Sequence, residues 1–239
     1  MSIMRNLDGF STVDAAHPLR AIPFLDPTRW AVWFDDYLAY DKTQGNAAYT
    51  LTNTNGVDTI LGPTGILTIT LGGADNDLAQ VYLTDGAFAT VAGKKLVWEA
   101  RVKVNKGAGG TIGQEEVFVG LSSVQTGTNF MDAGGLIRTM NESMGFLSFD
   151  ATANVNCIQG QADSVSTEAA AFAYADDTWM VLGCYYDGVQ TYFYKDDVLE
   201  ATLTDNEPTS VVTPMLYIKA GAGHAKILSA DYFLVATER

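Results

Sequence analysis

The stretch from Asp177 to Leu203, DTWMVLGCYYDGVQTYFYKDDVLEATL, constrains the fold more than any other part of the chain. Two runs of β-branched and aromatic residues meet at Asp187-Gly188, and a third run follows Asp196-Asp197. An Asp-Gly pair between such runs is a strong β-hairpin signal, because a tight primed turn needs positive φ at its centre. β-branched and aromatic side chains also suit a pleated, half-buried surface. The stretch therefore predicts three consecutive antiparallel strands.

The segment from Lys95 to Val104 shows the clearest alternation in the sequence. Strict alternation of apolar and polar residues indicates a strand with one face in a core and the other toward solvent. The predicted core face carries Leu96, Trp98, Ala100, Val102 and Val104, and the predicted outer face carries Val97, Glu99, Arg101 and Lys103.

About a dozen such strands follow one another with turn signals at short intervals, and the sequence has no sustained amphipathic helix. Two segments are ambiguous: Trp30 to Tyr40 fits a short helix or a strand, and the Ala-rich run from Glu168 to Ala175 fits a helical turn or a loop. The pattern predicts an all-β protein, an antiparallel jelly-roll β-sandwich. We expect one domain over residues 30–239, preceded by an extended N-terminal arm over residues 1–29.

The predicted arm has no regular period, and Pro18, Pro23 and Pro27 block both a helix and a central strand. It carries more apolar residues than a solvated tail needs, so the arm either wraps its own sandwich or lies on a neighbouring subunit. The candidate partner-binding residues are Ile3, Met4, Leu7, Phe10, Leu19, Ile22, Phe24 and Leu25.

The charge balance limits the partners. With 28 acidic and 14 basic residues the formal net charge is −14, which argues against binding nucleic-acid phosphate or an anionic membrane surface. No apolar run reaches the length that spans a bilayer, and the N-terminus lacks the apolar region of a secretory signal. We therefore expect a protein made in the cytoplasm that stays there or leaves within an assembly.

Cys157 and Cys184 each lie inside an apolar run, and the sequence has no C-x-x-C pair that would indicate zinc or redox chemistry. Two buried thiols or one disulfide are both compatible with this pattern.

Three segments together resemble the concanavalin A-like jelly roll of legume-type lectins, laminin-G modules and laminarinase-type glycosidases. They are GKKLVWEARVKV (Gly93 to Val104), WMVLGCYYDGVQTYFYKDDVLEA (Trp179 to Ala201) and the closing ILSADYFLVATE (Ile227 to Glu238). The second turn of the middle segment reads Asp-Asp where these families have Asp-Gly. The resemblance covers about 140 residues and implies the fold; it says little about function, because this fold hosts many unrelated sites.

A glycosidase of this type needs a Glu-x-Asp-x-x-Glu-like strand, which places two carboxylates on one face. The nearest candidates, Glu115 and Glu116, are adjacent, so their side chains should diverge, and Glu142 stands alone. His17 lies in the arm and His224 in a Gly-rich loop, and no G-x-S-x-G elbow supplies a nucleophile. The sequence therefore predicts that the protein is not an enzyme.

A structural calcium ion is the one cofactor with some support in the sequence. Asp75 and Asp77 place oxygen ligands in a short loop, although the pattern lacks the rest of an EF-hand loop and favours a solvated Asx turn. The resemblance places another candidate ligand at Asp231, a strand residue that needs either a metal or backbone donors if it is buried. Candidate glycan-binding residues, an aromatic ring beside polar groups, are Asn129 with Phe130, and Tyr174 with Asp176 and Asp177.

The overall layout also resembles structural proteins of tailed-phage virions, in which an apolar arm precedes a compact β domain. On this basis we expect a non-enzymatic virion protein, a capsid decoration or cement subunit made in the host cytoplasm. Its partners would be the major capsid protein, other virion subunits and further copies of itself. The alternative is a lectin-like carbohydrate-binding module that recognises surface glycans, for example on a phage fibre.

Overall fold

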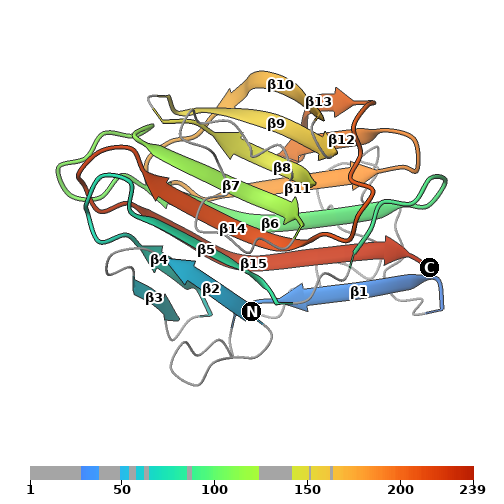
Figure 1. Ribbon diagram of the computed structural model, residues 1–239, viewed down its shortest axis with the longest axis horizontal. Coiled ribbons are helices and arrows are strands. Elements are labelled where there is room, and N and C mark those ends of the chain that lie inside the picture. Colours follow the sequence, from blue (N-terminus) through green and yellow to red (C-terminus); the bar gives the residue numbers. More distant parts are fainter. Residues whose placement is uncertain are drawn as a thin grey trace.

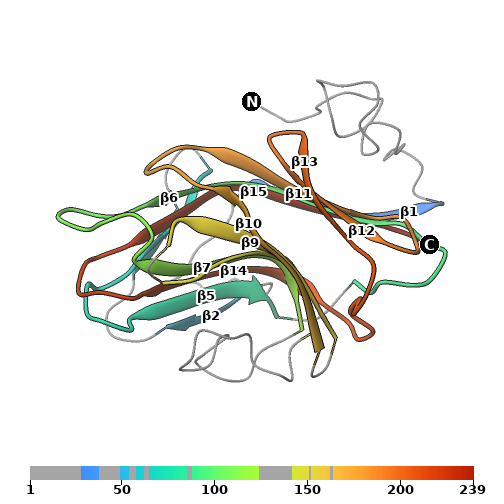
Figure 2. The ribbon, with the colours of Figure 1, turned by 90° about the horizontal axis from the view of Figure 1, so that it is seen from above.

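The computed structural model describes residues 28–37, 49–53, 58–61, 65–84, 88–123, 142–150, 152–161 and 164–239. These residues form fifteen β-strands and, within the described ranges, no helix. The strands build two antiparallel sheets stacked face to face, which Figure 2 shows as an upper and a lower layer. The predicted all-β antiparallel jelly-roll sandwich is confirmed.

The first sheet has eight strands in the order β13-β12-β11-β6-β15-β4-β3, with β1 beside β15 as well (Figure 1). The strand β15 is the longest, and β1 and β4 pair with successive parts of the same edge of it. The strands are β1 (Trp30–Asp35), β3 (Asp58–Leu61), β4 (Leu67–Thr70), β6 (Leu96–Asn105), β11 (Met180–Tyr186), β12 (Thr191–Lys195), β13 (Val198–Leu203) and β15 (Ile227–Glu238).

The second sheet has seven strands in the order β10-β9-β8-β7-β14-β5-β2. The strands are β2 (Tyr49–Asn53), β5 (Leu78–Leu83), β7 (Glu115–Ser122), β8 (Ser143–Ser148), β9 (Asn154–Gln161), β10 (Ser164–Ala173) and β14 (Thr213–Ala220). Both faces of its central strands are buried: Val119 points into the space between the sheets, and Phe118 and Tyr217 belong to a separate apolar cluster.

The predicted three-stranded unit is present as β11, β12 and β13, and its two turns differ in kind. Between β12 and β13, Asp196 and Asp197 both have positive φ (49° and 68°), so this Asp-Asp pair forms the two-residue turn. Between β11 and β12 the connection is longer, and Asp187 N–H donates to the Gln190 carbonyl. Gly188 in that connection has a φ of 102°, and a Cβ there would lie 2.7 Å from Gly93. Glycine is therefore required at Gly188 by its conformation and by close backbone contact.

The alternation of β6 places its predicted core face between the sheets. Leu96, Trp98, Ala100, Val102 and Val104 are all buried there. The Trp98 ring contacts Phe146 of the opposite sheet edge to face, with ring centroids 5.7 Å apart. The outer face departs from the expectation at one end, because Val97 and Glu99 are buried as well.

The two ambiguous segments both form strands. The Ala-rich run lies in β10, an edge strand that pairs with β9 and contains a bulge between Glu168 and Phe172. Cross-strand pairing outweighs the helix preference of alanine at this edge. The segment that begins at Trp30 forms β1, antiparallel to the end of β15.

Residues 1–27, which make up most of the predicted arm, lie outside the described residues, and so do its eight candidate partner-binding side chains. The division into an arm and a domain stays a prediction. No helix in the described part of the chain has the length and apolarity to cross a membrane.

Candidate functional site

A strip of charged side chains around a tryptophan lies on the outer face of the eight-stranded sheet, at one end of β6 and β11. Arg101 and Lys103 alternate with the core residues of β6 and so point outward. Trp179 directly precedes β11, and because Met180 is buried in the core, Trp179 faces the outer side. We call this surface the Trp179 strip; its members are Arg101, Lys103, Lys106, Asp176, Asp177, Trp179 and Asp231.

Each cation of the Trp179 strip is paired with a carboxylate from another segment. Arg101 Nη1 lies 2.7 Å from Asp231 Oδ2, and Lys103 Nζ lies 2.6 Å from Asp177 Oδ1. Lys106 Nζ lies 3.3 Å from Asp176 Oδ2, and the Lys106 backbone N–H donates to the same carboxylate. These side chains are 25–53% exposed, so their remaining donors and acceptors are accessible from solvent.

The indole of Trp179 is half-buried and lies against two of these cations. The Arg101 guanidinium carbon is 4.6 Å from the ring centroid, and Lys103 Nζ is 5.3 Å from it. Both distances fit cation–π contacts, which hold the ring in place on the sheet. The result is a partly exposed indole fixed by the two cations that lie over its ring.

The turn before β11 fixes Asp177 in this position. Asp177 has a φ of 51°, a conformation that Asp tolerates better than most residues, and its N–H donates to the Val104 carbonyl. Hydrogen bonds from Lys103 and Asn105, together with the Lys103 charge, lower the pKa of Asp177 below its ordinary value. Asp177 is therefore ionised at neutral pH and acts as an acceptor.

The structure unites three of the residues singled out in the sequence and removes another from the surface. Asp176 and Asp177, predicted glycan ligands, and Asp231, a predicted calcium ligand, all belong to the Trp179 strip. Tyr174, the predicted stacking aromatic, is only 6% exposed, and its hydroxyl donates to Glu115 Oε1 over 2.6 Å. Burial and the Glu115 charge raise the pKa of Tyr174 well above its ordinary value. Tyr174 therefore offers no free ring face, and Trp179 supplies the aromatic surface of this region.

Asp231 meets Arg101 because of a bulge in β15. Ala230 pairs with Val102 and Tyr232 pairs with Arg101, so Asp231 is the extra residue between them. The bulge takes Asp231 out of the alternation that would have placed it on one face with Phe233. Its partner is an arginine, where the sequence led us to expect a metal or backbone donors.

The predicted calcium ligands of the other loop do not converge with a further acid. Asp75 is exposed, and the buried Asp77 accepts a hydrogen bond from the Ala74 N–H over 2.8 Å. Among the described residues, no group of three or more His, Cys, Asp or Glu side chains could hold a metal ion. The calcium ion stays a prediction at these positions. Asn129 and Phe130, the other predicted glycan ligands, lie outside the described ranges.

Glu115 and Glu116 diverge as the sequence predicted. Glu115 is completely buried, with Oε2 3.0 Å from Nζ of the equally buried Lys226, and Gly113 N–H donates to its Oε1. Glu116 points to the other face of β7, where it pairs with Lys219 at 3.2 Å. Burial raises the pKa of Glu116, and Lys219 opposes part of that rise. Within the described strands, no strand carries two carboxylates at alternate positions.

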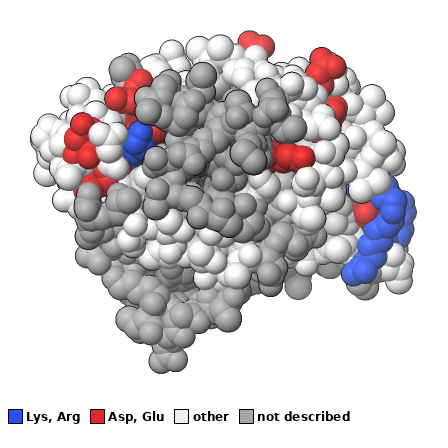
Figure 3. Space-filling view, viewed as in Figure 1, with Lys and Arg blue, Asp and Glu red and all other residues white. Residues whose placement is uncertain are grey.

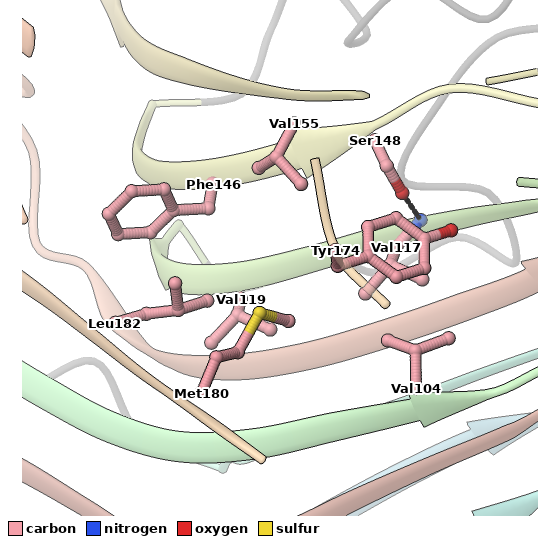
Figure 4. A pocket seen from close by; sticks show the side chains of 9 residues that line it. All are labelled: Val104, Val117, Val119, Phe146, Ser148, Val155, Tyr174, Met180 and Leu182. Atoms are coloured by element: carbon pink, nitrogen blue, oxygen red, sulfur yellow. Dashed lines mark hydrogen bonds between the residues drawn. The ribbon is translucent and has the colours of Figure 1, made fainter. Parts of the chain in front are cut away.

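A small cavity lies inside the sandwich beside Tyr174 (Figure 4). Its volume is about 10 Å³, room for a single water molecule at most. Apart from Tyr174 and Ser148, whose Oγ accepts from the Val117 N–H, the lining side chains are apolar: Val104, Val117, Val119, Phe146, Val155, Met180 and Leu182. The cavity is a gap in core packing and does not serve as a ligand site.

Both cysteines are free and buried, so of the two alternatives the structure has thiols. Burial raises the pKa of each thiol above its ordinary value.

Figure 3 shows the side of the molecule that lies opposite the Trp179 strip. On this side the described charged groups lie mainly near the margins, with one group of Lys and Arg at the right edge.

The sequence matches no family model, and no curated protein is similar to it. Solved structures are similar in fold. An endo-1,3-beta-glucanase from Streptomyces sioyaensis has a TM-score of 0.62 at 13% identity, over 88% of this chain and 97% of that one. The metal-free carbohydrate recognition domain of Emp46p has a TM-score of 0.59 at 12% identity, over 84% and 93%. A beta-glucanase from Bacillus licheniformis has a TM-score of 0.57 at 10% identity, over 87% and 98%.

These similarities correct two predictions. The similar structures are a carbohydrate recognition domain and glucanases, so the prediction of a virion decoration subunit was wrong, and the predicted capsid partners have no support. The prediction that the protein is not an enzyme is contradicted as well, because several of the similar structures are glycosidases and the fold is compatible with an enzymatic role. The resemblance in sequence to lectins and laminarinases is confirmed at the level of fold. The chain has the concanavalin A-like jelly-roll fold found in these lectin domains and glucanases.

Proposed function

We propose that the protein is a carbohydrate-binding module and that its binding surface is the Trp179 strip. The observation that carries the proposal is the half-buried Trp179 indole, held on an outer sheet face between side chains that still have accessible donors and acceptors. A sugar ring offers an apolar C–H face for an aromatic ring and hydroxyls at its edge. The strip has both complements within one short segment of sheet.

Two of the ion pairs, Arg101 with Asp231 and Lys103 with Asp177, make this surface suitable for hydroxyl recognition. A guanidinium has five N–H donors and an ammonium three, so one carboxylate partner leaves donors over on Arg101 and Lys103. Asp177 and Asp231 likewise keep lone pairs beyond those used by their cations. A hydroxyl both donates and accepts, and it can therefore bridge neighbouring donors and acceptors along the strip.

The fold supports the same class of ligand. The similar structures include a carbohydrate recognition domain and glucanases. At 10–13% identity these likenesses concern the fold, so the location and the residues of the site rest on the Trp179 strip itself.

The test is titration calorimetry of the full chain against a panel of soluble polysaccharides and their oligosaccharides. We expect binding to at least one of them, and we expect Trp179→Ala to weaken it at least about tenfold, since aromatic anchors dominate such contacts. Phe149→Ala is the matched control, because Phe149 is likewise partly exposed but packs against the apolar cluster on the outer face of the seven-stranded sheet. Circular dichroism checks that both variants are folded.

Two results would reject the proposal. One is the absence of binding across the panel. The other is binding that Trp179→Ala leaves intact while the variant keeps the β-sheet spectrum of the parent protein.

A further inference from the structure

The charges of the Trp179 strip define what kind of glycan it accepts, if the proposed function holds. Three cations and three carboxylates lie along the strip, and each cation is within 3.3 Å of a carboxylate oxygen. The formal charge of the strip is therefore zero, although it contains six charged side chains. From this charge pairing we infer that the ligand is a neutral, linear oligosaccharide, and that uronic or sulfated glycans are rejected.

The reason is the state of each cation before a ligand arrives. A carboxylate or sulfate of an acidic glycan would find the charges of Lys103 and Arg101 already balanced by Asp177 and Asp231. Binding to the remaining donors would bring the anion next to these carboxylates, and like charges in contact are unfavourable. The net charge of −14 adds a long-range repulsion of the same sign, which grows at low salt.

A neutral sugar meets none of these penalties. Its hydroxyls use the donors and acceptors that the ion pairs leave over, so the pairs remain in place while the ligand binds. The indole then contributes contact with the apolar ring face, a contribution that does not depend on ligand charge. Neutral ligands therefore gain the aromatic contact without breaking an ion pair.

The length of the strip indicates a ligand with more than one sugar ring. From Arg101 to Asn105 the strand advances about 14 Å at roughly 3.4 Å per residue. The partners follow the same direction, with Asp231 beside Arg101, then Asp177 beside Lys103, then Asp176 beside Lys106. A chain of sugar rings lying along β6 would meet these pairs in succession, with Trp179 near the middle.

The experiment compares neutral and acidic probes against the same protein. Laminarin, mannan and dextran serve as neutral probes, and polygalacturonate and heparin as acidic probes, by calorimetry at about 150 mM salt. We expect at least one neutral probe to bind at least about tenfold more tightly than either acidic probe. Hexasaccharides of the neutral probe should bind more tightly than its disaccharides.

Removing one acid of a pair tests the cause directly. In Asp177→Asn or Asp231→Asn, Lys103 or Arg101 loses its carboxylate, so binding of the acidic probes should strengthen several-fold and become salt-dependent. Glu238→Gln is the control, because it removes the carboxylate that Arg29 faces at 3.7 Å at the other end of β6. That variant should leave both classes of probe unchanged.

The outcomes separate the inference from the function on which it rests. If an acidic probe binds most tightly and Trp179→Ala abolishes its binding, the strip is a glycan site but the inferred neutrality is wrong. Unchanged acidic binding in both Asp variants would also overturn the inference, since the ion pairs would then not control selectivity. If no probe binds, or if Trp179→Ala has no effect on any, the proposed function itself fails.

Discussion

The buried pair of Glu115 and Lys226 should be the most sensitive polar contact in the described part of the fold. Both side chains are fully buried, with Lys226 Nζ 3.0 Å from Glu115 Oε2, and Lys226 also donates to the Thr111 carbonyl at 2.9 Å. The pair connects the start of β7 to the loop before β15, so it fastens two loops at the end of the sandwich. We expect Lys226→Met to leave the Glu115 charge buried without its cation.

The size of the expected loss of stability follows from the burial of both side chains. Removing one partner of a buried ion pair costs about 3–5 kcal/mol, a large part of a total stability of about 5–15 kcal/mol. Glu115→Leu should cost a similar amount, because it leaves Lys226 buried and unpaired. The double variant replaces both charges by apolar side chains, so it should lose only about 2–4 kcal/mol of stability. Most of that loss should come from the Tyr174 hydroxyl and the Gly113 N–H, which both donate to Glu115 and would lose their acceptor.

The assay is equilibrium unfolding in guanidinium chloride, followed by the fluorescence of the four tryptophans. Lys195→Met is the matched control: its partner Asp196 is equally close, at 2.9 Å, but the two side chains are 27% and 47% exposed. That variant should lose no more than about 1 kcal/mol. A loss of stability in Lys226→Met as small as that of the control would contradict this expectation, and so would two single losses that add to within about 0.5 kcal/mol in the double variant.

Three further predictions concern stability and reactivity. Gly107→Ala should destabilise the fold by more than about 3 kcal/mol, because the φ of Gly107 is 71° and the new Cβ would lie 1.7 Å from the Ala225 carbonyl oxygen. Gly93 has a φ of 77° but open space around it, so Gly93→Ala should lose only about 1–2 kcal/mol of stability, and equal unfolding midpoints for the two variants would contradict this. Burial would raise the pKa of Glu142, but hydrogen bonds from Ser210 and Thr209 outweigh it and lower the pKa below 4.5. The stability that Glu142 contributes is thus present above its unfolded-state pKa and lost as pH falls through the lower folded-state pKa. Glu142→Gln should destabilise the fold by about 1–2 kcal/mol at pH 7 and by less below about pH 4, and an equal loss of stability at both pH values would be contrary evidence. Both cysteine thiols should resist a thiol reagent in the native protein and react only on unfolding, since each is buried and has a raised pKa; rapid labelling of the folded chain would disprove this.

The corrected predictions show where the sequence pattern was over-interpreted. The virion prediction rested on an apolar arm and on the lack of a catalytic motif, and neither feature identifies a partner. The similar structures instead associate the fold with lectin domains and glucanases. What the pattern did indicate correctly, the divergence of Glu115 and Glu116, follows from the alternation of side chains along one strand.

The sequence alone determined most of the strands and much of the core of this protein, although not the strand β10. Alternation along β6 identified the buried residues from Leu96 to Val104, and the Asp187-Gly188 and Asp196-Asp197 pairs located the turns of the β11–β13 unit. These features depend on neighbours within a few residues, where the period of a strand and the φ preference of a turn residue act directly.

Only the tertiary structure decided the candidate site. Asp231 and Arg101 are 130 positions apart, and they meet because β15 pairs with β6 and a bulge turns Asp231 toward the arginine. Trp179 reaches Arg101 and Lys103 because β11 pairs with the other edge of β6. Register between distant strands depends on the packing of the whole sandwich, so no local pattern predicts which outward-facing side chains become neighbours.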